Sequence, residues 1–274
     1  MITFDTYESA LGAVTADTGQ EIFDPATGEL IGIAALSTTA DLEAAIKTAR
    51  AAQKSFAQLS EAERCDALLK MADAIEANAE PLAQLLSREQ GKPLNGPNAR
   101  FEVGACAAWL RATASFDSPD FTAVDADVKA IVRYRPLGVV GAIGPWNWPL
   151  MITIWQIAPA LRMGNVVVVK PSEHTPLSVS ALIAIAQSVL PAGVLEIVTG
   201  AGDIGTALST HPDIAKIMFT GSTATGKQIV AASADNLSRL TLELGGNDAG
   251  IILDDANVAE IAENLFWGAF INTC

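Results

Sequence analysis

The chain has 274 residues, of which 50% are hydrophobic and 18% are charged, and its formal net charge at pH 7 is -14. The charged share lies below the roughly 25% of ordinary soluble domains, which indicates a large buried core. Nucleic acid and anionic membranes attract basic surfaces, so neither is expected as the main partner of this acidic chain.

The N-terminus, MITFDTYESA, has neither the basic start nor the apolar core of a signal peptide. Residues 21–36, EIFDPATGELIGIAAL, predict two short strands around the turn PATGE. The apolar residues then change to helical spacing, at Leu42, Ile46, Ala49 and Phe56. A small pair of strands followed by a helix is therefore expected at the start of the chain.

Ser60 and Glu63 have the spacing of a capping box, which predicts the start of the next helix. Its inward positions are expected at Cys65, Leu68, Leu69, Ala72 and Ile75. A further helix covers LAQLLSREQ and stops at GKP, and another covers roughly residues 97–115. The stretch VKAIVRYRPLG is predicted to be extended, with Pro136 at its end.

From Val139 onward, apolar strand candidates alternate with helices. They are GVVGAI, NVVVVK, VLEIVTG, AKIMFTG and RLTLEL, and a sixth, AGIIL, precedes a helix from about Asn257 to Phe270. None of the apolar runs reaches the roughly 18 residues of a membrane span. Continuous apolar strands between helices are typical of a parallel sheet covered on both faces. The expected fold is α/β, with a Rossmann-like parallel sheet preceded by an N-terminal segment of strands and helices.

Polar residues and glycines follow the carboxyl ends of five of these strands. They are GPWNWP, KPSE, TGAGD, TGST and the end of RLTLELGG, which contains Glu243. In an open α/β sheet, ligands bind beyond the carboxyl ends of the strands. Glycines, hydroxyls, an amide, a lysine and a carboxyl at one edge together predict a crevice for a ligand with phosphates and hydroxyls.

Each of these residues also has an ordinary structural explanation. Lys170 can simply reach water from its strand end, Asn147 can be a turn residue, and glycines make turns. Glu243 differs, because an acid in the apolar run LTLELGG costs free energy to bury unless it is paired or neutral. A buried carboxyl has a raised pKa and can serve as a general base near neutral pH, which favours a catalytic role over a structural one.

The stretch FTGSTATGKQ offers a different phosphate site. Gly221, Gly226 and Lys227 have the spacing of a P-loop, and GIILDD, residues 250–255, resembles a Walker B strand. A P-loop needs Ser or Thr at the next position to hold Mg²⁺, and this chain has Gln228. A P-loop NTPase is therefore the weaker alternative.

Several other chemistries lack their patterns. The two histidines have no Cys or His at ligand spacing, so no metal site is expected. The G-x-S-x-G elbow of hydrolases is missing, as is the G-x-G-x-x-G fingerprint, so a dinucleotide would bind in a nonstandard way. The three cysteines give no disulfide framework, which favours a reducing, cytoplasmic setting.

Five pieces of the sequence stand in the order and spacing of a known family: FDPATGELIG, GAIGPWNWPL, NVVVVKPSEHTPLS, FTGSTATG and LELGGND. From about residue 20 the chain resembles the NAD(P)-dependent aldehyde dehydrogenase family. The resemblance implies that residues 1–120 and 137–274 form the cofactor-binding unit. Residues 121–136 would supply a strand of an oligomerisation arm, and the family's catalytic domain is expected to be absent, which puts a family-like homo-oligomer in doubt.

The resemblance further implies a site for NAD. The residues expected around it are Ile143, Gly144, Pro145, Trp146, Lys170, Ser172, Glu173, Gly202, Gly205, Phe219, Gly221, Ser222 and Leu244. Lys170 and Glu173 would bond the adenosine ribose hydroxyls, and the acid at Glu173 would repel the 2′-phosphate of NADP. Gly221 and Ser222 would meet the pyrophosphate at the N-terminus of the next helix.

The reaction that the resemblance implies turns a small-molecule aldehyde into a carboxylic acid through a cysteine thioester. A thiolate attacks the aldehyde carbon, and the side-chain amide of Asn147 stabilises the oxyanion together with the cysteine N–H. Hydride passes to NAD, and Glu243 activates the water that hydrolyses the thioester.

Cys274 departs from the family pattern for the nucleophile, Asn-x-Gly-Gln-x-Cys. Here Asn272 and Thr273 lead directly to Cys274, three positions early, so either Gly-Gln-x is missing or Cys274 is not the equivalent residue. Two functions stay open: an aldehyde dehydrogenase, or a non-catalytic remnant that binds a nucleotide or a protein partner. In both, the apolar surface that would face the missing domain is expected to be exposed.

Overall fold

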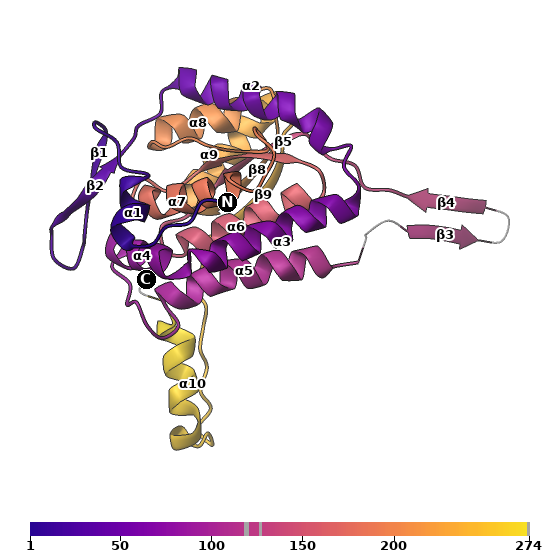
Figure 1. Cartoon of the computed structure of the whole chain (residues 1–274). Coiled ribbons are helices and arrows are strands. Elements are labelled where there is room, and N and C mark those ends of the chain that lie inside the picture. The colour runs from indigo at the N-terminus through magenta and orange to yellow at the C-terminus, as the bar shows by residue number, and fades with distance from the viewer. Residues whose placement is uncertain (118–120, 126–127, 273–274) are drawn as a thin grey trace.

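The computed structural model describes residues 1–117, 121–125 and 128–272. Its centre is a parallel five-stranded sheet with the strand order β7-β6-β5-β8-β9 (Figure 1). The strands are β5 (Val139–Ile143), β6 (Val166–Lys170), β7 (Leu195–Ile197), β8 (Ile214–Gly221) and β9 (Arg239–Leu244). Four of them lie within a predicted run and β8 begins one residue before its run, and the expected α/β fold with a parallel sheet is confirmed.

Helices cover both faces of this sheet, and the chain winds outward from β5 in two directions. One face is covered by α6 (Pro149–Arg162) and α7 (Pro176–Gln187); the other carries α2 (Thr39–Phe56), α8 (Gly202–Thr210) and α9 (Thr223–Asn236). β5 and β6 are buried along their whole length, which explains their unbroken apolar sequences. The winding reverses between β5 and β8, and a crevice opens at the carboxyl ends of such a pair.

A second helical layer lies outside α6 and α7. It contains α3 (Glu61–Ala77), α4 (Ala79–Gln90) and α5 (Ala99–Ser115), while the short α1 (Tyr7–Gly12), which the sequence did not predict, packs on α4. The Ser60–Glu63 capping box starts α3 as predicted, and Gly91 ends α4 in a left-handed conformation, at a φ of 83°. In the described parts of the chain, no helix combines the length and the apolarity that crossing a membrane requires.

One prediction for α3 is wrong. Leu69 was expected to face inward but is exposed, and Cys65 is only half buried. The buried face of α3 instead includes Met71 and Ala74, because the neighbouring helices cover a stripe that passes through Leu68 and turns away from Leu69.

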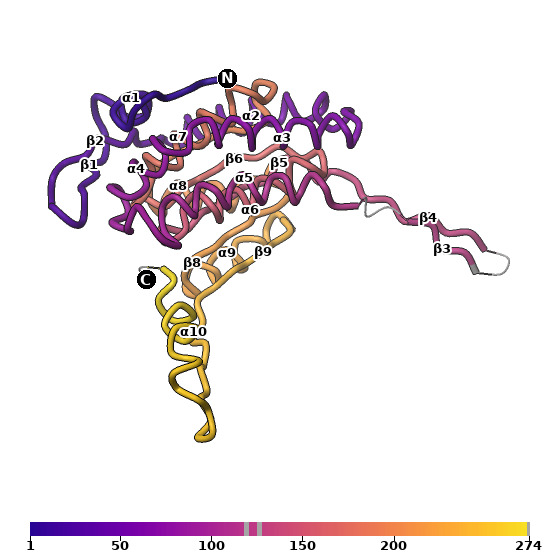
Figure 2. Tube along the Cα trace, turned by 60° about the horizontal axis from the view of Figure 1, so that its bottom comes forward, coloured from indigo at the N-terminus to yellow at the C-terminus, as the bar shows by residue number. Residues whose placement is uncertain are grey.

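Two antiparallel hairpins flank the body. β1 (Gln20–Phe23) and β2 (Leu30–Ala34) form the predicted pair at the N-terminus. β3 (Phe121–Asp125) and β4 (Val128–Val132) form a hairpin that projects far from the sheet (Figures 1 and 2). The first five residues of the stretch predicted to be extended, VKAIVRYRPLG, form the second strand of this hairpin.

The last described segment also leaves the body. α10 (Val258–Phe270), which the sequence predicted from about Asn257, is capped by Asn257 and projects away from the sheet with no buried residue (Figure 2). The strand predicted at AGIIL is wrong: residues 249–253 form none. Since β9 is the edge of the described sheet, no described strand forms a ladder with them, and Ile251 and Leu253 are 82% and 67% exposed. The expected exposed apolar surface is thus present.

Gly141 allows β8 and α8 to pack closely on β5. A Cβ at Gly141 would lie 2.7 Å from Ile217 Cδ1 and 3.2 Å from Leu208 Cγ. Gly141→Ala is therefore expected to lower the free energy of unfolding by about 1–3 kcal/mol, since it overpacks a buried site. Urea denaturation measures this change.

Gly104, on the exposed side of α5, is the matched control. A Cβ there would meet nothing within 4 Å, so Gly104→Ala is expected to raise the free energy of unfolding by up to about 1 kcal/mol. Equal effects of the two substitutions would contradict the packing explanation for Gly141.

Candidate functional site

A crevice of about 1100 Å³ lies beyond the carboxyl ends of the central strands. The predicted site residues that line it are Ile143, Gly144, Pro145, Trp146, Asn147, Lys170, Ser172, Glu173, Gly202, Gly205, Phe219, Gly221, Ser222, Glu243 and Leu244. The remaining predicted residue, Cys274, lies outside the described residues. The fold therefore brings every described member of the predicted site to one place.

The loop after β5 is held from several sides. Gly144 N donates to Lys170 O at 3.0 Å, which ties this loop to the end of β6. Asn147 O accepts from Lys92 Nζ at 2.8 Å and from Asn272 Nδ2 at 3.0 Å. Asn147 Oδ1 accepts from Trp148 N at 3.0 Å, so backbone and side chain of Asn147 are both fixed.

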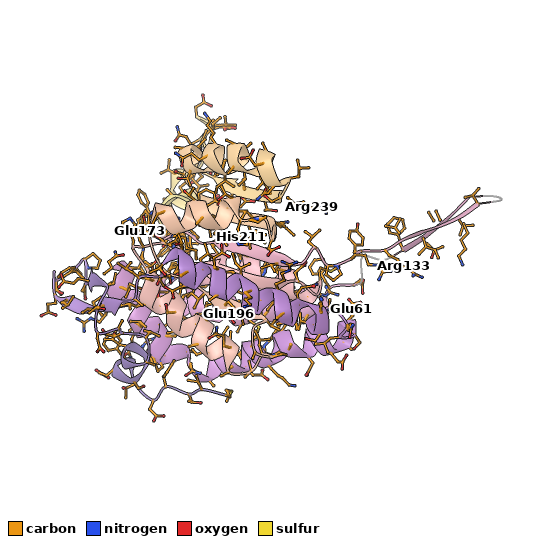
Figure 3. All side chains as sticks on the ribbon, turned by 90° about the horizontal axis from the view of Figure 1, so that it is seen from above. Glu61, Arg133, Glu173, Glu196, His211 and Arg239 are labelled. Atoms are coloured by element: carbon orange, nitrogen blue, oxygen red, sulfur yellow. The ribbon has the colours of Figure 1, made fainter. Side chains whose placement is uncertain are left out.

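The ordinary structural explanation for Lys170, that its side chain reaches water, does not hold. The residue is 4% exposed, and Nζ donates to Pro171 O at 2.8 Å and lies 3.8 Å from Glu173 Oε2. Burial lowers the pKa of the Lys170 ammonium, while the carboxylates of Glu173 and Asp203 act in the opposite direction. In Figure 3, Glu173 lies on the side of the body away from Arg133, which adjoins the projecting hairpin.

Two helices begin at the crevice. Gly202 is the first residue of α8, and Ser222 caps α9 by accepting from Thr225 N at 3.2 Å. A Cβ at Gly221 would lie 2.6 Å from the Phe219 ring, so the turn from β8 into α9 requires a glycine at that point. Both helices turn the positive ends of their dipoles toward the crevice.

The P-loop alternative does not fit this geometry. Lys227 is exposed on α9 and is not among the residues that line the crevice. Gly226 is buried, and a Cβ there would lie 2.6 Å from Leu244 Cδ2, so this glycine serves the packing of α9 on β9. The proposed Walker B segment, residues 250–255, contains no strand.

Glu243 lies on the crevice but is not buried. The expectation of a buried carboxyl is wrong for this structure, because β9 is the edge of the described sheet and its last residues, Glu243 and Leu244, are exposed. The argument from burial to a general base therefore does not apply to Glu243 here.

Two buried carboxylates that bind the loops beside the crevice were not found in the sequence. α6 and α7 both begin with proline and lack a capping side chain of their own. Glu102 of α5 accepts from Leu150 N at 2.8 Å and from Met151 N at 3.1 Å. Glu102 stands in the apolar stretch FEVGACAAWL, and a lone acid in such a stretch is the signal that could have revealed it.

Glu89 of α4 binds the first backbone amides of α7 in the same way. Its carboxylate accepts from Leu177 N at 2.6 Å and from Ser178 N at 2.8 Å. Burial raises the pKa of Glu89 to about 7, against the lowering effect of these two hydrogen bonds. The loops after β5 and β6 thus lead into helices whose first amides are bound by carboxylates from another layer.

Comparison with known proteins places this geometry in context. The model of the aldehyde dehydrogenase family matches residues 13–274. Aldehyde dehydrogenase LUC3 from a Fusarium species is 39% identical over 271 residues, which are 98% of this chain and 57% of that protein. The chain spans about half the length of the curated relatives it matches.

Solved structures show the same partial match. PnpE from Pseudomonas sp. WBC-3 is 41% identical, with a TM-score of 0.85, over 92% of this chain and 53% of its own. An aldehyde dehydrogenase from Bacillus cereus, solved as an NAD⁺ complex, is 37% identical, with a TM-score of 0.85, over 92% of this chain and 52% of its own.

The raised pKa of Glu89 predicts a pH-dependent stability. Its folded value, about 7, lies above the ordinary 4.5, so the folded state binds the proton more tightly. The resulting stability is fully present below pH 4.5 and is lost as the pH rises through about 7. Relative to Glu89→Gln, the native chain is expected to lose on the order of 3 kcal/mol over this range.

Urea unfolding of both proteins at several pH values between 5 and 8 checks this expectation. Comparing the two proteins removes the contribution of every other titrating group. A difference in unfolding free energy that stays constant with pH would show that Glu89 keeps one protonation state throughout.

Proposed function

Because the chain belongs to the aldehyde dehydrogenase family, we propose that the protein, at its native length, oxidises an aldehyde to a carboxylic acid with NAD. One observation carries the proposal. All the described residues expected to hold the cofactor, together with Asn147 and Glu243, line one crevice at the point where the sheet changes its winding direction. Dinucleotides bind at this place in doubly wound sheets.

The helix N-termini along this edge of the sheet support the binding of a dinucleotide. The first amides of α6 and α7 are already bound by Glu102 and Glu89. The N-terminus of α8 has no side-chain cap, and that of α9 has only the neutral hydroxyl of Ser222. The first turn of α8 carries the carboxylate of Asp203, whereas that of α9 carries no acid. An anionic pyrophosphate is therefore attracted to the start of α9, where Gly221 permits close approach of the backbone.

The loop after β6 supports recognition of the ribose. Lys170 supplies a buried ammonium donor and Glu173 a carboxylate acceptor at the same edge of the crevice. A diol can donate to the carboxylate and accept from the ammonium. A 2′-phosphate would meet the negative charge of Glu173, so the proposal favours NAD over NADP.

For the reaction, the chain supplies an oxyanion donor and a base. The Nδ2 amide of Asn147 would stabilise the oxyanion that forms when a cysteine thiolate, for which Cys274 is a candidate, attacks the aldehyde. When bound, NAD supplies the hydride acceptor. Glu243 would then remove a proton from the water that hydrolyses the thioester.

Aromatic side chains beside the crevice favour an apolar aldehyde. Trp155 lines the crevice, and its ring centroid lies 5.1 Å from that of Trp109 on α5. Phe101 and Trp148 form an edge-to-face pair with centroids 6.2 Å apart. This surface of α5 and α6 offers flat apolar contact to a substrate that approaches Asn147.

The β3–β4 hairpin supports a further proposal, assembly with another copy of the protein. The hairpin projects beyond the body, and it exposes four apolar side chains: Phe121, Val124, Val128 and Ile131. An exposed apolar ribbon of this kind is suited to being covered by a partner.

We expect the protein to bind NAD in a calorimetric titration. Lys170→Met is expected to weaken binding about 10- to 100-fold, because it removes a hydrogen bond from a charged donor. Lys227→Met is the matched control and is expected to leave binding unchanged, since Lys227 is exposed outside the crevice. If Lys227→Met weakened nucleotide binding more than Lys170→Met, and if the protein bound ATP in the presence of Mg²⁺, the P-loop alternative would be favoured.

Asn147→Ala is expected to lower kcat for aldehyde oxidation about 100-fold in the protein at its native length, as the loss of an oxyanion donor does. The affinity for NAD, measured by calorimetry, should change little. Asn95→Ala, in the exposed loop between α4 and α5, serves as the control. An unchanged kcat in Asn147→Ala would remove Asn147 from the proposed chemistry.

A further inference from the structure

A buried ion pair lies directly behind the Asn147 loop. Lys92 Nζ lies 2.7 Å from Glu102 Oε2, and both side chains are 0% exposed. Lys92 precedes α5 by a few residues, and Glu102 lies on the first turn of that helix. None of the roles assigned so far to the crevice uses Lys92.

The ammonium of Lys92 joins three separate parts of the chain. It donates to Glu102 Oε2, to Asn147 O at 2.8 Å and to Asn272 Oδ1 at 3.2 Å. It also lies 4.1 Å from the centre of the Trp148 ring, within the range of a cation–π contact.

The other end of the pair holds the start of α6. Glu102 accepts from Leu150 N and Met151 N with its second oxygen, Oε1. The ion pair therefore binds the Asn147 loop at two points, the carbonyl of Asn147 before the helix and the first free amides within it. The peptide that carries the Asn147 side chain has little freedom to rotate.

Stability alone is a weak reason for such a pair. Removing two charges from water is costly, and an apolar pair of the same size is often equally stable or more so. A buried pair does fix geometry, because its hydrogen bonds have narrow ranges of distance and angle. Those fixed bonds end on the peptide of Asn147 and on Asn272, two positions before Cys274.

We propose that Lys92, together with Glu102, is a positioning residue that orients the Asn147 amide for the reacting aldehyde oxygen and ties the Asn272 segment to it. The proposal rests on the proposed function, in which Asn147 is the oxyanion donor. Neither Lys92 nor Glu102 touches the substrate or the cofactor in this assignment; both act through Asn147.

The first test measures the loop directly, in the protein at its native length. The double variant Lys92→Met/Glu102→Gln removes both charges, while a glutamine Oε1 can still accept from Leu150 N and Met151 N. Hydrogen–deuterium exchange of peptides covering residues 144–152 is expected to become at least about 10-fold faster. Leu110→Ala, which opens a buried site elsewhere on α5, is the control for general destabilisation.

The second test is a double-mutant cycle on aldehyde oxidation. In the native background Asn147→Ala is expected to lower kcat about 100-fold. In the Lys92→Met/Glu102→Gln background, Asn147→Ala should lower kcat only a few-fold, because the Asn147 amide is already misplaced. In Leu110→Ala it should keep its full effect, since that variant leaves the Asn147 loop in place.

The outcomes separate the two proposals. If Asn147→Ala costs the same in all three backgrounds, or if exchange in residues 144–152 is unchanged, Lys92 and Glu102 do not position Asn147. If Asn147→Ala has no effect on turnover in the native background, the proposed function fails at Asn147, and the positioning role fails with it. Coupled loss of kcat and faster exchange confined to the loop support the positioning role.

Discussion

The architecture depends on how the first amides of α6 and α7 are satisfied. Both helices begin with proline after a sharp loop, and neither has a capping side chain of its own. A helix start that is buried without acceptors costs free energy for every unpaired amide. Glu102 and Glu89, from the outer helical layer, provide those acceptors. The outer layer is thereby joined to the two loops that form the crevice.

This capping also determines where the crevice can attract an anion. Glu102 and Glu89 already bind the first amides of α6 and α7, and Asp203 lies in the first turn of α8, so the helix start that faces the crevice without an acid is that of α9. The polar groups on the other side are Lys170 and Glu173. In the proposed function, phosphate recognition and hydroxyl recognition would therefore lie at the ends of different strands, as an extended dinucleotide requires.

The sequence predicted the sheet well and its edge poorly. β5 and β6 were recognised because a buried parallel strand is a continuous apolar run. AGIIL has the same composition but forms no strand, and Glu243 is exposed rather than buried. Both errors have one cause: a local pattern reports that a residue is suited to burial, whereas burial itself needs a neighbouring element to cover it.

The sequence by itself determined the α/β class, the strand ends and the residues that meet at them, because these follow from local apolar runs and from the rule that parallel strands end at one edge. Only the tertiary structure showed the partners of Lys92, Glu102 and Glu89. A buried charge is recognised by what surrounds it, and its partners lie far away in the sequence, as Lys92 and Asn272 do. Such pairings are fixed by the packing of whole elements, which a local pattern does not contain.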